Sequence, residues 1–113
     1  MIRRIAALLA LIAVSLGAFG AHGLDTVLTG EAKEWWETAT FYLLVHAVAA
    51  LLLDGFGARR AAICAMAGSG LFAATLYAMA LGAPTFLGMI TPIGGVLMLA
   101  GWAMVAFGRF HTK

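Results

Sequence analysis

The chain alternates four long apolar segments with short stretches that hold almost all of its charge. A helix that crosses the hydrocarbon core of a bilayer needs roughly 20 apolar residues. The longest uncharged run, 48 residues from Ala61 to Gly108, is long enough for two such helices. We therefore expect one domain, residues 1–113, of the all-α membrane class: a compact antiparallel bundle of four transmembrane helices. The expected spans are residues 5–22, 35–53, 61–82 and 91–108.

Residues at the segment ends refine the boundaries of these helices. Trp35 and Trp36 mark the headgroup level of the second span, because indole rings prefer the boundary between lipid and water. Thr91 is expected to cap the fourth helix, with Pro92 at the first helical position, where no backbone hydrogen bond is lost. Gly23 is expected to end the first helix in a left-handed conformation.

Composition and charge predict a membrane protein and orient it. Hydrophobic residues make up 64% of the chain and charged residues 11%, with a mean hydropathy of +1.02, which excludes a water-soluble fold of this length. Six of the seven basic residues fall on one side of the expected spans, so that side should be cytoplasmic, with both termini inside. Those six are Arg3, Arg4, Arg59, Arg60, Arg109 and Lys113.

The first segment also resembles a secretory signal peptide. Two arginines precede an apolar run, and small residues follow at positions 17, 18, 20 and 21, where a signal peptidase could cut. The sequence keeps this segment from Met1 onward. We therefore expect a retained transmembrane helix and not a cleaved leader.

The depth of polar residues along their helices predicts an outer polar layer. At 1.5 Å per residue, His22 and Glu37 both lie about 25 Å from the cytoplasmic end of their spans, where they can face each other as a structural lock. Side chains that lipid cannot solvate should face the interior of the bundle. The predicted layer consists of His22, Glu37, Thr38, Tyr77 and Thr91.

A polar and aromatic stripe continues from this layer down the second helix. Spacings of three and four place four residues along one face, namely Trp35, Thr38, Tyr42 and His46. Ser69 lies at the depth of His46, about 12 Å, and is its first candidate partner. We favour hydrogen bonding between helices as the role of this stripe. The alternative is a path for protons or a small polar solute, with His46 titrating and Glu37 at the entrance.

Small residues at regular spacing predict where helices pack closely. Lipid gives no hydrophobic drive for helix association, so close backbone approach carries the packing. The candidate packing residues are Gly17 and Gly20 on the first helix, Gly70, Ala74 and Ala78 on the third, and Gly94 and Gly101 on the fourth. One chain can bury only some of these stripes internally. The others could serve a homo-oligomer or a larger membrane complex.

The sequence argues against several classes of function. The single cysteine, Cys64, excludes an intramolecular disulfide, and no clustered thiols or histidines supply a metal site. Hydrolase signatures and nucleotide-binding glycine loops are absent. The basic residues do not cluster on one face, as nucleic-acid binding requires. We therefore expect no enzyme activity, no cofactor and no nucleic-acid partner.

Several ordered motifs resemble one family of small membrane proteins. They are GAFGAHGL at 17–24, WETA at 36–39 followed by Tyr42 and His46, Leu76 with Tyr77, and TPIGG at 91–95. On these motifs the chain is similar, almost end to end, to the family that includes transmembrane protein 256 (domain of unknown function 423). The family more often has Ser, Gly, Ser where this chain has Ala73, Ala74 and Thr75. The resemblance implies four membrane helices, a bacterial inner-membrane location with mitochondrial relatives, and no established reaction or ligand.

The combined reading predicts a non-catalytic accessory or scaffold module of the inner membrane. Its expected partners are membrane lipid and either a second copy of itself or a larger membrane complex, reached through the glycine and alanine stripes. The alternative function is a small carrier or conduit that uses Glu37, Tyr42 and His46.

Overall fold

The structure, a computed structural model, describes residues 1–24, 26–28 and 30–108. Its elements are α1 (Ile2–His22), α2 (Glu31–Gly55), α3 (Arg59–Ala80), the short 3₁₀ helix η1 (Thr85–Met89) and α4 (Thr91–Phe107). By length and composition, α1, α2, α3 and the combined segment Thr85–Phe107 can each cross a membrane. The prediction of an all-α membrane protein with four spans is confirmed.

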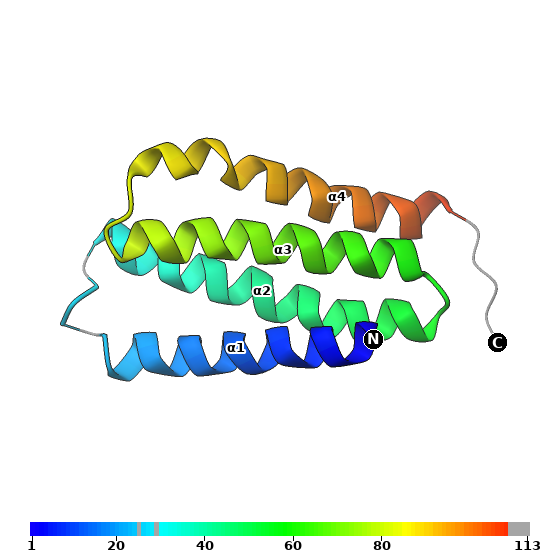
Figure 1. Cartoon of the computed structure of the whole chain (residues 1–113), viewed down its shortest axis with the longest axis horizontal. Helices are drawn as coiled ribbons and strands as arrows, with labels where there is room; N and C mark the ends of the chain where they lie inside the picture. The colour runs from blue at the N-terminus through cyan, green and yellow to red at the C-terminus, as the bar shows by residue number, and fades with distance from the viewer. Residues whose placement is uncertain (25, 29, 109–113) are drawn as a thin grey trace.

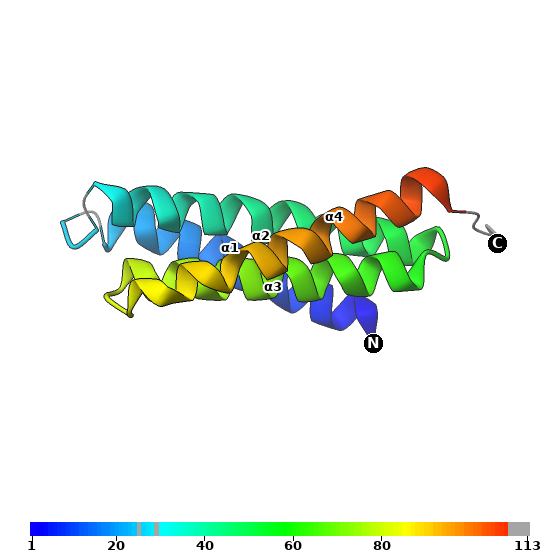
Figure 2. The ribbon, with the colours of Figure 1, turned by 90° about the horizontal axis from the view of Figure 1, so that it is seen from above.

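The helices run antiparallel in chain order, so that α1 begins and α4 ends at the same end of the bundle (Figure 1). The main interfaces are α1 with α2, α2 with α3, and α3 with α4. Seen from above, α4 crosses α3 obliquely, and its later part turns toward α2 (Figure 2). The two outer helices, α1 and α4, share no packed interface in the described residues. The bundle is therefore open, with a lateral groove on either side of α3.

Glycines set the separation of α3 and α4. A Cβ atom added to Gly94 would lie 2.6 Å from the Gly68 carbonyl oxygen, and one added to Gly68 would lie 2.7 Å from the Gly94 carbonyl oxygen. Gly101 is nearly as close to α3, at 3.1 Å from the Ala61 carbonyl oxygen. Gly94 and Gly101 thus lie at an internal interface. Gly94 packs against Gly68, which the sequence did not single out, and Gly101 packs against Ala61.

Glycines of α1 also allow α2 to pack closely against it. Gly20 lies against the indole of Trp36, and a Cβ atom on Gly17 would lie 2.9 Å from the methyl group of Thr40. The stripe on α3 is different, because a Cβ atom on Gly70 would meet nothing within 4 Å, and Ala74 is exposed. Gly70 and Ala74 line the groove between α1 and α3. Ala78, the third residue of the predicted stripe, is half-buried and does not line this groove.

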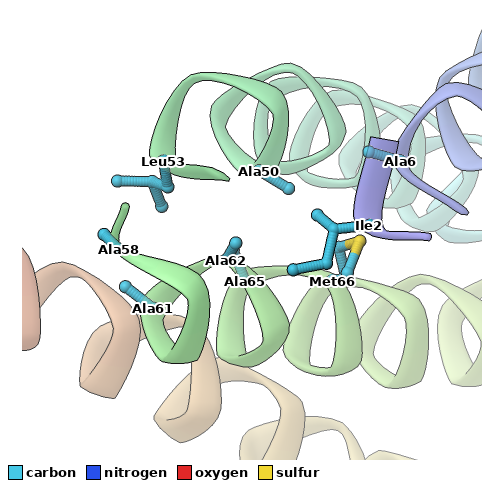
Figure 3. Packing of buried hydrophobic residues seen from close by; sticks show 9 residues of the cluster. All are labelled: Ile2, Ala6, Ala50, Leu53, Ala58, Ala61, Ala62, Ala65 and Met66. Carbon is cyan, nitrogen blue, oxygen red and sulfur yellow. The ribbon is translucent and has the colours of Figure 1, made fainter. Parts of the chain in front are cut away.

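The core at the end where α1 begins is made mainly of alanine. Figure 3 shows side chains of α1, α2, α3 and the α2–α3 turn meeting there. The cluster consists of Ile2, Ala6, Ala50, Leu53, Ala58, Ala61, Ala62, Ala65 and Met66. Such small side chains let the backbones come close, as is typical of helices packed within a membrane.

Two predicted helix ends are wrong in detail. Gly23 is right-handed, with φ −78° and ψ −32°, because its N–H continues the helical pattern by bonding to the Phe19 carbonyl. Thr91 is the first residue of α4 and not its cap, because η1 runs directly into α4 through Ile90. The Thr91 hydroxyl oxygen instead lies 3.2 Å from the Leu87 carbonyl oxygen of η1.

Candidate functional site

His46 is the most deeply buried ionisable residue among the sequence candidates, at 5% exposure. Its Nδ1 lies 2.8 Å from the Tyr42 carbonyl oxygen, and its Nε2 receives the Trp102 indole N–H at 3.0 Å. A carbonyl can only accept and an indole can only donate. His46 is therefore the neutral tautomer with its proton on Nδ1, and both ring nitrogens are engaged.

The partner of His46 is Trp102 on α4, and the prediction of Ser69 is wrong. Ser69 is fully buried, but its hydroxyl donates to the Met66 carbonyl of its own helix at 3.4 Å. A buried hydroxyl commonly bonds to the preceding turn when no closer acceptor faces it. Depth could have identified Trp102, because it lies six residues from Gly108, about 9 Å from the end of its span.

A second polar link joins α1, α2 and α3. The Trp36 indole N–H donates to the Leu16 carbonyl at 2.8 Å, and the Trp36 and Tyr77 rings meet edge to face, with centroids 4.6 Å apart. Thr40 gives its single proton to the Trp36 carbonyl at 2.9 Å, so Tyr77 donates to Thr40 Oγ1 at 2.6 Å. Thr40 has no place in the predicted layer, although it is one helical turn from Trp36.

A third link joins α3 to the start of α4. Thr75 and Thr91 are both buried, and their hydroxyl oxygens are 2.6 Å apart. Each also approaches a carbonyl of its own chain segment, Phe72 at 2.9 Å and Leu87 at 3.2 Å. Two protons serve three contacts, so one hydroxyl donates to the other and the second donates to a carbonyl.

The sequence predicts that the polar residues of the outer layer and of the stripe face the interior of the bundle. Four of them are exposed instead, namely His22, Glu37, Thr38 and Tyr42. No hydrogen bond or ion pair joins His22 to Glu37 among the residues that the structure describes. His22 and Glu37 lie at similar depths along their helices, but their side chains do not point toward each other. At 100° per residue, Gly20 and Trp36 take the faces that meet, which turns His22 and Glu37 away.

The groove between α2 and α4 follows the predicted stripe. Three adjoining hollows of about 400, 390 and 470 Å³ share Phe72 in their walls. Tyr42, His46 and Trp102 line the deep end, whereas Glu34 and Glu37 line the outer end. Each hollow is within the size range of ligand pockets.

A second groove lies between α1 and α3, over α2. Its hollow of about 150 Å³ is almost entirely apolar, and α3 contributes Gly70, Ala73, Ala74 and Tyr77 to it. The facing wall comes from α1, with Leu9, Ile12 and Leu16. Within the described residues, no group of three or more His, Cys, Asp or Glu side chains could hold a metal ion.

Comparison with known proteins gives a family and no activity. Residues 16–95 match the family model described as "Protein of unknown function (DUF423)". A UPF0382 membrane protein of Haemophilus influenzae is 41% identical over 88% of this chain and 86% of its own length. UPF0382 membrane protein YwdK of Bacillus subtilis is 40% identical over 85% of each chain.

A third relative, the UPF0382 membrane protein SSP2132 of Staphylococcus saprophyticus, is 40% identical over 92% of each chain. No solved structure matches this chain significantly. The relatives are bacterial proteins named for their membrane location alone.

Proposed function

Because the chain belongs to the DUF423 family of membrane proteins of unknown function, we propose that it is a non-catalytic accessory or scaffold module of the bacterial inner membrane. In this proposal it packs against a second copy of itself or against a larger membrane complex, with both termini in the cytoplasm. The positive charge near one end of the bundle supports that orientation, because cytoplasmic loops are enriched in Arg and Lys.

One observation carries the proposal: among the described residues, Gly70 and Ala74 of the small-residue stripe on α3 are open to a groove and not packed closely on another helix. Gly68 makes the close contact with α4, whereas a Cβ atom on Gly70 meets nothing within 4 Å. Gly70 and Ala74 lie four residues apart on one face, which is the spacing that lets a second helix approach closely. The apolar groove beside them gives such a helix a surface to pack on.

The geometry favours this function over the conduit. A proton path through His46 needs a ring nitrogen that can exchange its proton, but both nitrogens bond to partners on α2 and α4. The chain between His46 and Asp54 has no ionisable side chain. Glu37, the supposed entrance, is exposed. It lies nine residues of helix, about 13 Å, from His46.

Co-purification tests the proposal. A tagged chain is extracted from native membranes in a mild detergent, together with an untagged copy. We expect a stoichiometric partner, either the untagged copy or another membrane protein, and Gly70→Leu should remove it by filling the groove. Gly95→Leu is the matched control, because a Cβ atom at Gly95 also meets nothing within 4 Å but lies on the opposite side of α3. Recovery of the chain alone would overturn the proposal.

A further inference from the structure

We infer that the groove between α2 and α4 binds one phospholipid that carries an ammonium headgroup. This lipid belongs to the leaflet whose headgroups lie at the depth of Glu34. This inference is independent of the proposed association, which uses the other groove. It rests on the length of the groove, on its walls and on the charges at its outer end.

The groove has the length of one leaflet. Along α2 it runs from Glu34 to His46, twelve residues or about 18 Å of helix, whereas half of a hydrocarbon core is about 15 Å. The hydrogen bond between His46 and Trp102 joins its two walls at the deep end. A lipid chain that enters from the headgroup level therefore reaches the middle of the membrane and ends there.

The walls suit an acyl chain along most of this length. Aromatic rings from all three helices line it, namely Trp35, Tyr42, Phe72 and Trp102, and Gly95 leaves space on α4. The Tyr42 and Phe72 rings meet edge to face, with centroids 5.0 Å apart, which fixes them against each other. A preformed apolar surface of this kind binds a chain with little loss of side-chain freedom.

The charges at the outer end select the headgroup. Glu34 and Glu37 line the hollow there, and no Lys, Arg or His side chain does. Lys33 lies in the wall of a different hollow, beside Gly17 and Gly20 of α1, which Glu37 also lines and Glu34 does not. The two carboxylates favour an ammonium group and disfavour a headgroup whose only charge is its phosphate.

Two hydrogen-bond donors lie beside these carboxylates. Trp35 and Thr38 line the same hollow. Neither the Trp35 indole N–H nor the Thr38 hydroxyl has a hydrogen-bond partner among the described residues. A zwitterionic headgroup can use both features, since its phosphate accepts from Trp35 and Thr38 while its ammonium reaches Glu34 or Glu37. Phosphatidylethanolamine, with a primary ammonium, meets these requirements.

Quenching of tryptophan fluorescence by brominated lipid tests the inference. The full chain is reconstituted in vesicles of equal parts phosphatidylethanolamine and phosphatidylglycerol, with bromine on the acyl chains of one lipid or the other. Trp35 and Trp102 line the groove, and Trp36 is buried at 4% exposure. We expect relative binding of the ethanolamine lipid to exceed that of the glycerol lipid about threefold, as one exposed ion pair allows.

Three variants locate the preference. In the double variant Glu34→Gln/Glu37→Gln, the ratio of ethanolamine-lipid to glycerol-lipid binding should fall to about 1. Glu31→Gln changes a carboxylate outside the groove and should keep the ratio of the natural chain. Gly95→Leu should remove the preference by filling the groove. Equal quenching by both lipids in the natural chain overturns the inference. So does a preference that persists in either the double variant or Gly95→Leu. The glutamine variants are isosteric and exposed, so they keep the test valid if Gly95→Leu does not fold.

Discussion

Trp102 on α4 donates its indole N–H to Nε2 of His46 on α2 at 3.0 Å, and this bond joins two helices that share little other contact. It fixes the tautomer of His46 and closes the deep end of the groove between α2 and α4. The stripe on α2 therefore ends in a structural tie, in which His46 holds α2 to α4.

A double-mutant cycle measures this tie. His46→Leu and Trp102→Phe each remove one side of the bond, and the pair removes both. We expect a coupling free energy of about 0.6 kcal/mol and at most about 1.7 kcal/mol, the range measured for hydrogen bonds between membrane helices. Unfolding of the purified variants in detergent, followed by circular dichroism, supplies the four stabilities. Strictly additive effects would show that the bond contributes nothing.

Neighbouring glycines on α4 should respond oppositely to a single methyl group. Gly94→Ala places its Cβ atom 2.6 Å from the Gly68 carbonyl oxygen, so α3 and α4 must separate. We expect a loss of about 1–3 kcal/mol in the free energy of unfolding, the usual cost of overpacking. Gly95→Ala is the control, since nothing lies within 4 Å of its Cβ atom, and it should leave stability unchanged or raise it. Equal losses at both positions would contradict the interface.

Tyr77 should contribute more through its ring than through its hydroxyl. Tyr77→Phe removes the hydrogen bond to Thr40 but keeps the edge-to-face contact with Trp36, so a loss of about 0.6 kcal/mol is expected. Tyr77→Ala also removes the ring, and we expect a loss of about 3 kcal/mol or more. Thermal unfolding of both variants in the same detergent compares them. A Phe variant as unstable as the Ala variant would assign the stability to the hydroxyl.

Cysteine labelling tests the orientation in the membrane. In a Cys64→Ser background, Thr26→Cys lies in the α1–α2 loop and Phe56→Cys lies where α2 turns into α3. Arg3, Arg4, Arg59 and Arg60 lie at the Phe56 end of the bundle and Lys33 at the other. We therefore expect a membrane-impermeant maleimide to label position 26 in intact cells. Position 56 should be labelled only after the membrane is broken. The reverse pattern would place the termini outside.

The sequence predicts the spans well because hydropathy measures the one property that a span requires. Depth along each helix is also predictable, since the rise per residue is fixed, and it placed His46 at mid-membrane. The face of the helix on which a residue meets its neighbours is not predictable in this way, because it depends on which small residue packs against which neighbouring helix. Gly20 and Trp36 take the α1–α2 contact, so His22 and Glu37, at the right depth, face outward.

The choice among glycines could not be made from spacing either. Gly68 and Gly70 are two residues apart on α3, and the regular stripe contains Gly70. The structure uses Gly68 against Gly94 and leaves Gly70 in the open groove. The counterpart on α4 decides between them, and a single sequence does not carry that pairing.

The mass of the particle released from native membranes tests the central claim most directly. One chain has a mass of 11.8 kDa. Native mass spectrometry of the protein in a mild detergent should give a larger mass, which equals one chain plus either a second copy or another membrane protein. Gly70→Leu should return the particle to a single chain that remains folded, because it fills the groove between α1 and α3. A particle of one chain alone in the natural protein would contradict the account.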